Sequence, residues 1–212
     1  MRRSALRCAL GAVASAWLVA CAPAARPLTG ASAPTRLVPA SANLRAPQQV
    51  GFRWEFRDDQ LAIRGEGAAR LAPPDSARLD LFVDGGLGSG NAFIIGDTVR
   101  ARVPMGERLI PPAALFWGAV GRLAVPPGDT TVRVVGDTVR ADIAGPRGIF
   151  RAAFVGDSLV VLERIADGRI VERVERTGTV VRYRQLASRR ALDLTILRRV
   201  AVPGFDAAIW TR

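Results

Sequence analysis

Apolar and polar residues alternate along the chain from residue 48 onward. Val50, Phe52, Trp54 and Phe56 occupy every second position, with polar residues between them. This period of two is typical of a strand with one buried and one solvated face. A second strand follows over residues 61–71, and its glycines predict a bend or bulge where the sheet curves.

A short phrase, an aliphatic residue followed by Gly-Asp and then Thr or Ser, recurs in residues 95–100, 135–140 and 155–159. Each Gly-Asp pair lies between strand-like segments, which predicts a hairpin turn with positive φ. Turns at 167–168 and 177–178 predict two more hairpins. Strands then follow one another at intervals of 8 to 11 residues, as in an antiparallel meander. A phosphate-binding loop is excluded because a strand follows each phrase.

One segment has the apolar spacing of a helix. It begins after Pro111-Pro112 and extends from Ala113 to about Leu123, since proline favours the first turn. Its apolar face carries Leu115, Phe116, Ala119, Val120 and Leu123, and Trp117 widens that face. Two interpretations stay open: a core helix that crosses the sheet, or a lid over an apolar cavity.

The first residues resemble a secretion signal. Three arginines precede an apolar stretch, residues 8–19, that is too short to span a bilayer. Leu18-Val19-Ala20-Cys21 resembles a lipobox, whose cysteine receives diacylglycerol. The sequence thus predicts a signal peptide over 1–20 and lipid attachment at Cys21. The alternative is an ordinary signal cut near residues 22–25.

Two features extend this prediction. Cys8 is the only other cysteine, so the exported chain has no intramolecular disulfide that would explain Cys21. Residues 21–47 are rich in Ala, Pro and Ser, which predicts a tether of roughly 30 Å between the anchor and a β domain over 48–212. Ala22 in place of Asp is compatible with sorting to the outer membrane, at its periplasmic face.

Charge and composition narrow the function. The net charge is +11, and removal of Arg2, Arg3 and Arg7 with the signal lowers it to +8. A basic exported surface fits anionic phospholipid or lipopolysaccharide, whereas scattered arginines and few aromatic residues argue against a nucleic-acid groove. There is no histidine, which excludes Ser-His-Asp catalysis and the common zinc sites.

Other catalytic readings have little support. The carboxylates of Asp58, Asp59, Glu66, Asp75 and Asp80 fall at turns or on solvated strand faces. Among exposed nucleophiles, a serine in the glycine-rich segment 85–90 has neither histidine nor lysine to activate it. We therefore expect no enzyme activity, no cofactor and no metal.

The strand pattern as a whole resembles the LolA/LolB/LppX-like envelope lipoproteins over residues 48–210. The resemblance lies in the order and spacing of residues 64–67, 70–81, 109–112 and 205–210. It implies a mainly β fold: a curved antiparallel sheet, an unclosed half-barrel of about 11 strands, with one covering helix. This chain lacks the clear amphipathic helix that precedes the first strand in the carriers.

The resemblance also implies binding of acyl chains, of a lipid or a lipoprotein, in an apolar concavity. Candidate lining residues are Phe52, Trp54, Phe56, Phe82, Phe93, Phe116, Trp117, Phe150 and Phe154, although each alone is also compatible with ordinary core packing. The alternative function is a structural or interaction lipoprotein whose sheet is fully packed and whose surface meets another envelope protein.

Replacement of the proposed anchor residue tests the first prediction. Cys21→Ser removes the thiol that would accept diacylglycerol, so we expect palmitate labelling to disappear and the signal to stay uncleaved or to be cut elsewhere. Metabolic labelling and intact mass measure both effects. A labelled, membrane-bound variant would show that Cys21 is not the anchor.

Overall fold

A computed structural model describes residues 22–39, 44, 46–86, 88–102 and 108–210. The strands are β1 (Ala31–Ala33), β2 (Gln48–Arg57), β3 (Ala62–Ala72), β4 (Ser76–Val83), β5 (Ser89–Ile95), β6 (Thr98–Ala101), β7 (Asp129–Val135), β8 (Thr138–Gly145), β9 (Gly148–Val155), β10 (Ser158–Ala166), β11 (Arg169–Thr177), β12 (Val180–Gln185) and β13 (Arg190–Ala201). The helical elements are α2 (Ala113–Ala119) and the 3-10 turns η1 (Thr35–Leu37), η2 (Asp84–Gly86) and η3 (Ala207–Trp210).

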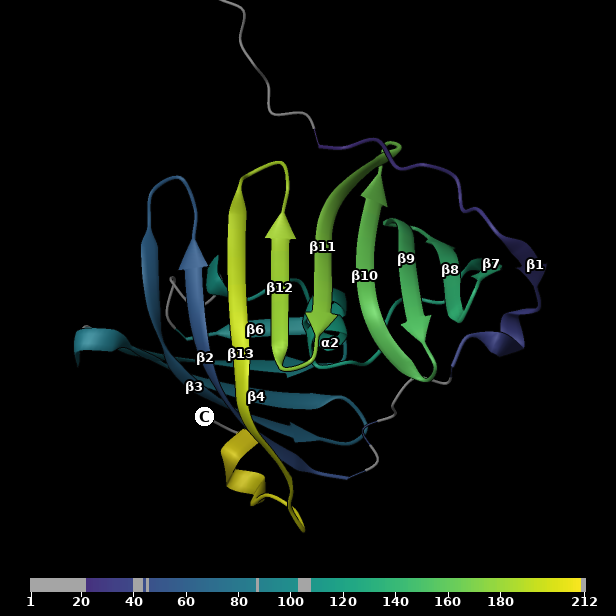
Figure 1. Cartoon of the computed structure of the whole chain (residues 1–212). Helices are drawn as coiled ribbons and strands as arrows, with labels where there is room; N and C mark the ends of the chain where they lie inside the picture. Colours follow the sequence, from purple (N-terminus) through teal and green to yellow (C-terminus); the bar gives the residue numbers. More distant parts are fainter. Residues whose placement is uncertain (1–21, 40–43, 45, 87, 103–107, 211–212) are drawn as a thin grey trace, which may run out of the picture.

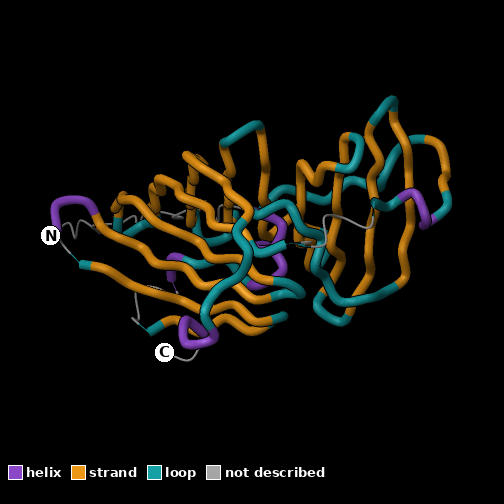
Figure 2. Tube along the Cα trace, turned by 90° about the horizontal axis from the view of Figure 1, so that it is seen from below, coloured by secondary structure: helices purple, strands orange, loops and turns teal. Residues whose placement is uncertain are grey.

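All of these strands form one antiparallel sheet in the order β1-β7-β8-β9-β10-β11-β12-β13-β2-β3-β4-β5-β6. Its edge strands, β1 and β6, do not pair with each other, so the sheet stays open. The strands lie side by side in Figure 1 and curve around the helix in Figure 2. The expected curved antiparallel sheet with one covering helix is confirmed, with 13 strands instead of about 11.

Four of the five predicted hairpin turns lie where the sequence predicts them, and the fifth lies one residue later; a further hairpin, between β8 and β9, is not predicted. Gly96, Gly136 and Gly156 have φ of 58°, 60° and 56° and connect β5 to β6, β7 to β8 and β9 to β10. The turns at 167–168 and 178–179 connect the next two pairs. Glycine reaches positive φ at little steric cost, and such turns match the twist of the strands that they join.

The sequence predicts a bend or a bulge at the glycines of β3. The β2–β3 ladder runs without a register shift from Gln48 paired with Leu71 to Arg57 paired with Ala62, so there is no bulge between these strands. Instead, a Cβ atom at Gly67 would lie 2.6 Å from Cζ of Phe52. The glycine makes room for an aromatic ring that lies across the neighbouring strand.

Helix α2 lies on the inner, concave face of the sheet, against β10, β11 and β12. It ends at Ala119, earlier than the expected Leu123, because Gly121 adopts a φ of 92°. Gly121 N–H donates to Gly118 O at 3.0 Å and Arg122 N–H to Trp117 O at 2.8 Å. This pair of bonds is a Schellman motif, which terminates helices.

Much of the segment expected to be a tether lies against the sheet instead. β1 pairs with β7, and Ala24 forms a bridge with Arg169. Ala25 N–H donates to Gly168 O at 2.8 Å. Composition alone does not reveal such pairing, because an Ala- and Pro-rich segment can still supply backbone groups to free strand ends. The signal over 1–20 and Cys21 lie outside the described residues.

Substitution of Gly67 tests the packing of β3. Gly67→Ala would force Cβ into the Phe52 ring, and we expect it to lower the free energy of unfolding by about 1–3 kcal/mol, measured by urea denaturation. Gly51→Ala is the matched control on β2, because nothing lies within 4 Å of its Cβ position. Equal stability of the two variants would contradict this explanation.

Candidate functional site

An apolar cavity of about 60 Å³ lies between the inner face of the sheet and the segment that contains α2. Strands β2, β3 and β4 form one wall, β12 and β13 form the other, and Leu109–Pro111 with α2 form the roof. The lining residues are Val50, Phe52, Trp54, Ala69, Leu79, Leu81, Leu109, Ile110, Pro111, Phe116, Ala119, Val120, Val181, Tyr183, Leu192, Leu194 and Ile196. Trp54 and Tyr183 are the two lining residues with a polar group in their side chains.

The pairing of β2 with β13 places much of this lining. Phe52 lies opposite Ile196 and Trp54 lies opposite Leu194, so side chains of the same face meet across the two strands. The indole nitrogen of Trp54 donates to Glu66 O at 2.9 Å. The only polar atom of that ring is therefore satisfied, and its apolar body faces the cavity.

The roof rests on the sheet mainly through apolar contacts. Leu115, Phe116 and Trp117 are buried, and the Phe116 and Trp117 rings meet edge to face at 5.1 Å between centroids. Within α2, the indole nitrogen of Trp117 donates to Gly96 O at 2.8 Å. The other polar ties lie at the ends of this segment: Arg199 donates to Val120 O at 3.4 Å, Arg122 donates to Pro74 O at 2.5 Å, and Arg108 lies 2.8 Å from the Asp58 carboxylate.

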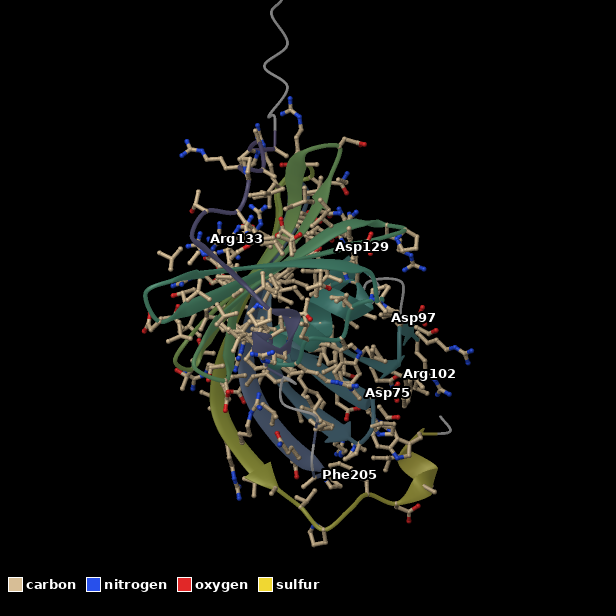
Figure 3. The ribbon with its side chains drawn as sticks, turned by 90° about the vertical axis from the view of Figure 1, so that its right-hand side faces the viewer. Asp75, Asp97, Arg102, Asp129, Arg133 and Phe205 are labelled. Atoms are coloured by element: carbon tan, nitrogen blue, oxygen red, sulfur yellow. The ribbon has the colours of Figure 1, made fainter. Side chains whose placement is uncertain are left out.

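A larger cleft of about 670 Å³ adjoins the other side of α2 and has a mixed lining. It includes Trp117 and Phe150 as well as charged residues. Among these, Asp75 and Asp97 lie on the same side of the molecule in Figure 3. The deepest charged residue of this cleft is Glu172, which is 1% exposed.

The Glu172 carboxylate has two partners that offset the cost of its burial. Oε1 accepts from the Tyr183 hydroxyl at 2.6 Å, and Oε2 accepts from Arg164 Nε at 2.6 Å. Burial, followed by the charge of Glu172, raises the pKa of Tyr183 well above its ordinary value, so the phenol stays a hydrogen-bond donor. Tyr183 thus connects this polar network to the apolar cavity that it also lines.

Seven of the nine aromatic candidates lie on the inner face. Phe52, Trp54 and Phe116 line the apolar cavity, Trp117 and Phe150 line the larger cleft, and Phe56 and Phe154 are fully buried. The structure thus brings three candidates together in one cavity.

Phe82 and Phe93 lie on the outer face, away from the cavity. The inner positions of β4 are Ala77, Leu79 and Leu81, so Phe82 points outward and is 54% exposed. Phe93 is paired with Arg78, whose guanidinium lies 5.4 Å from the centre of the Phe93 ring. The alternation within each strand, more than aromatic character, decides which side chains face inward.

The candidates chosen from the sequence were all aromatic, whereas most residues that line the apolar cavity are aliphatic. Leu192, Leu194 and Ile196 alternate along β13, and this period of two is a signal that could have found them. Tyr183 and Glu172 had no comparable signal, because their meeting depends on the register between β11 and β12.

The described ranges contain neither a cluster of metal-ligating side chains nor a membrane-spanning helix. No group of three or more His, Cys, Asp or Glu side chains there could hold a metal ion. No helix in the same part of the chain has the length and apolar character needed to cross a membrane.

Comparison with known proteins defines the class of fold. No family model and no curated protein sequence matches this chain. A LolA superfamily protein from Nitrosomonas europaea has a TM-score of 0.55 at 11% identity, over 79% of this chain and 91% of that one. A DUF1329 family protein from Desulfovibrio piger has a TM-score of 0.47 at 9% identity, over 78% and 89%. The chain has a LolA-like fold, which confirms the resemblance seen in its sequence.

The raised pKa of Tyr183 has a measurable consequence. The phenol ionises more readily in the unfolded chain than in the folded one. The free energy of unfolding therefore keeps its full value below about pH 10 and falls by about 1.4 kcal/mol per pH unit above it. Tyr183 is the only tyrosine, so tyrosinate absorbance should appear only with unfolding.

Tyr183→Phe is the control. It should remove this alkaline slope and lower stability at neutral pH by about 1–3 kcal/mol, because Glu172 loses a hydrogen bond. Urea denaturation at about pH 8 and about pH 10.5 measures both effects. Ionisation of the phenol near pH 10 in the folded protein would contradict the burial of this network.

Proposed function

We propose that this chain is a membrane-anchored envelope lipoprotein that binds acyl chains in the cavity beneath α2. It accepts or presents lipids or lipoproteins at the outer membrane and has no enzyme activity. The observation that carries the proposal is the lining of the cavity, which is apolar apart from the Tyr183 hydroxyl and the Trp54 indole N–H, both of which have hydrogen-bond partners. The LolA-like fold supports it.

The apolar cavity is too small to hold an acyl chain unless it opens. At about 60 Å³ it is smaller than the roughly 150 Å³ that accommodates benzene in an engineered cavity. An acyl chain therefore enters only if the roof moves away from the sheet. The side chains of α2 itself make one hydrogen bond to the rest of the described chain, that of Trp117, and an acyl chain would replace the apolar contacts that the helix loses when it moves.

The anchor belongs to the same proposal. Lipid on Cys21, several acyl chains at about 0.8 kcal/mol per buried CH₂, would hold the protein at one membrane. An anchored protein receives or presents cargo beside that membrane, whereas ferrying cargo across the periplasm needs a diffusing carrier. The outer membrane, at its periplasmic face, is the proposed location.

The small cavity volume also favours the alternative, a structural or interaction lipoprotein with a packed core. A binding measurement separates the two. If the closed cavity is the final state, fluorescent fatty acids will not bind at any concentration that leaves them dispersed.

Ala69→Phe tests the cavity. Ala69 is 3% exposed and lines the cavity, so a phenyl ring there should fill it and weaken fatty-acid binding about tenfold or more. The measurement is fluorescence titration of the chain from Ala22 onward, which keeps the contacts of Pro23–Ala33 with the sheet. Ala68→Phe, one residue along β3, is the control because Ala68 lies on the outer face. Equal losses in both variants, or no binding by the wild type, would reject acyl binding in this cavity.

A further inference from the structure

The first described residues cross the outer face of the sheet at the β10–β11 end. Pro23 O accepts from Ile170 N–H at 2.9 Å, and Ala22 O accepts from the Arg169 guanidinium at 2.9 Å. Farther along, Arg26 O accepts from the Arg151 guanidinium at 2.7 Å. The segment 22–33 is thus held at several points and ends as β1 beside β7.

A pocket of about 360 Å³ lies between this segment and the outer face of β8–β11. Its lining residues are Ala24, Arg26, Arg140, Arg151, Ala153, Val161, Glu163, Ile170 and Arg173. Four arginines therefore surround one carboxylate. The pocket has no part in the cavity beneath α2, because it lies on the opposite face of the sheet.

Two of these arginines have carboxylate partners. Arg151 forms a two-point ion pair with Asp142, with both distances at 2.7 Å. Arg173 Nη1 lies 3.2 Å from Glu163 Oε1, and Arg173 Nη2 forms a second ion pair with Glu175. These two arginines face three carboxylates, so the positive charge of the pocket comes from its other two arginines.

The other two arginines, Arg26 and Arg140, have no ion pair among the described residues. Arg140 also lies directly opposite Arg133 in the β7–β8 ladder, a like-charge arrangement that is destabilising without a counter-charge. Figure 3 shows Arg133 beside the N-terminal segment. This part of the outer face therefore has positive charge that an anion would balance.

We propose that this pocket binds the phosphate of an anionic phospholipid in the membrane that carries the protein, through Arg26 and Arg140. Guanidinium groups match phosphate in both charge and hydrogen-bond geometry. Arg140 comes from the sheet and Arg26 from the crossing segment, so the bound phosphate would join the two.

The position of the pocket identifies the membrane as the source of the phosphate. Ala24 lines the pocket three residues after Cys21, and three extended residues span at most about 11 Å. This step rests on the proposed anchor at Cys21. With the anchor in the bilayer, the pocket lies within reach of the headgroup layer, and one bound phospholipid fixes the orientation of the sheet.

Native mass spectrometry of the full chain, solubilised from membranes in a nonionic detergent, tests the proposal. Phosphatidylglycerol and phosphatidylcholine with identical acyl chains are added separately. The wild type should retain phosphatidylglycerol about tenfold or more over phosphatidylcholine. Arg26→Gln with Arg140→Gln should abolish that preference, since each nearby arginine contributes about tenfold or somewhat less at an anionic surface.

Arg182→Gln is the matched control, because Arg182 is exposed on the outer face of β12, outside the pocket. It should keep the preference. A preference that persists in the Arg26/Arg140 variant, or that is absent from the wild type, would overturn the proposal. Displacement of phosphatidylglycerol by an equal concentration of inorganic phosphate would also overturn it, because the site would then serve a soluble anion.

Failure of this proposal is distinguishable from failure of acyl binding. Ala69→Phe should lower the retention of phosphatidylcholine, which only the cavity beneath α2 can hold, and leave the phosphatidylglycerol at the outer pocket in place, because the two sites share no residue. The preference for phosphatidylglycerol should therefore persist in this variant. The Arg26/Arg140 variant should bind fluorescent fatty acid like the wild type. Loss of the phosphatidylglycerol preference in Ala69→Phe would place the headgroup preference in the cavity and reject the outer pocket.

Discussion

The pairing of β13 with β2 is the constraint on which the rest of the structure depends. It connects Ala191–Ala201 at the end of the chain with Gln48–Arg57 near its start. Without it, β2–β6 and β7–β13 would be two separate antiparallel sheets, each with an exposed apolar face. The pairing places Phe52 and Trp54 against Leu194 and Ile196, and so it also creates the wall of the apolar cavity.

The crossing between the two halves explains the position of α2. The chain leaves β6 at one edge of the sheet and begins β7 near the other, and the connection passes over the concave face. A short apolar helix is suited to that place, because it buries its side chains on a face that would otherwise be exposed. The same placement leaves a small apolar cavity on one side of the helix and a larger, partly polar cleft on the other.

The N-terminal segment changes the picture of how an anchor would act. A free tether would let the domain rotate relative to the membrane, whereas Pro23–Ala33 is bonded to the sheet. The freedom of the domain would therefore be small near the anchor. The outer pocket beneath this segment, with the arginines that lack ion pairs, lies where the membrane would be nearest.

The class of fold follows from the sequence, because hairpin turns and alternation are local: Gly136-Asp137 and Asp167-Gly168 specify their turns without reference to distant residues. The apolar face of β2 follows from the sequence as well. Which aromatic residues meet depends on the tertiary structure, since Phe82 and Phe93 differ from Phe52 in the face that their strands turn inward. The Glu172–Tyr183 hydrogen bond and the course of residues 22–33 also depend on the tertiary structure. These features depend on register and on long-range pairing, and a one-residue change of register reverses every side chain of a strand.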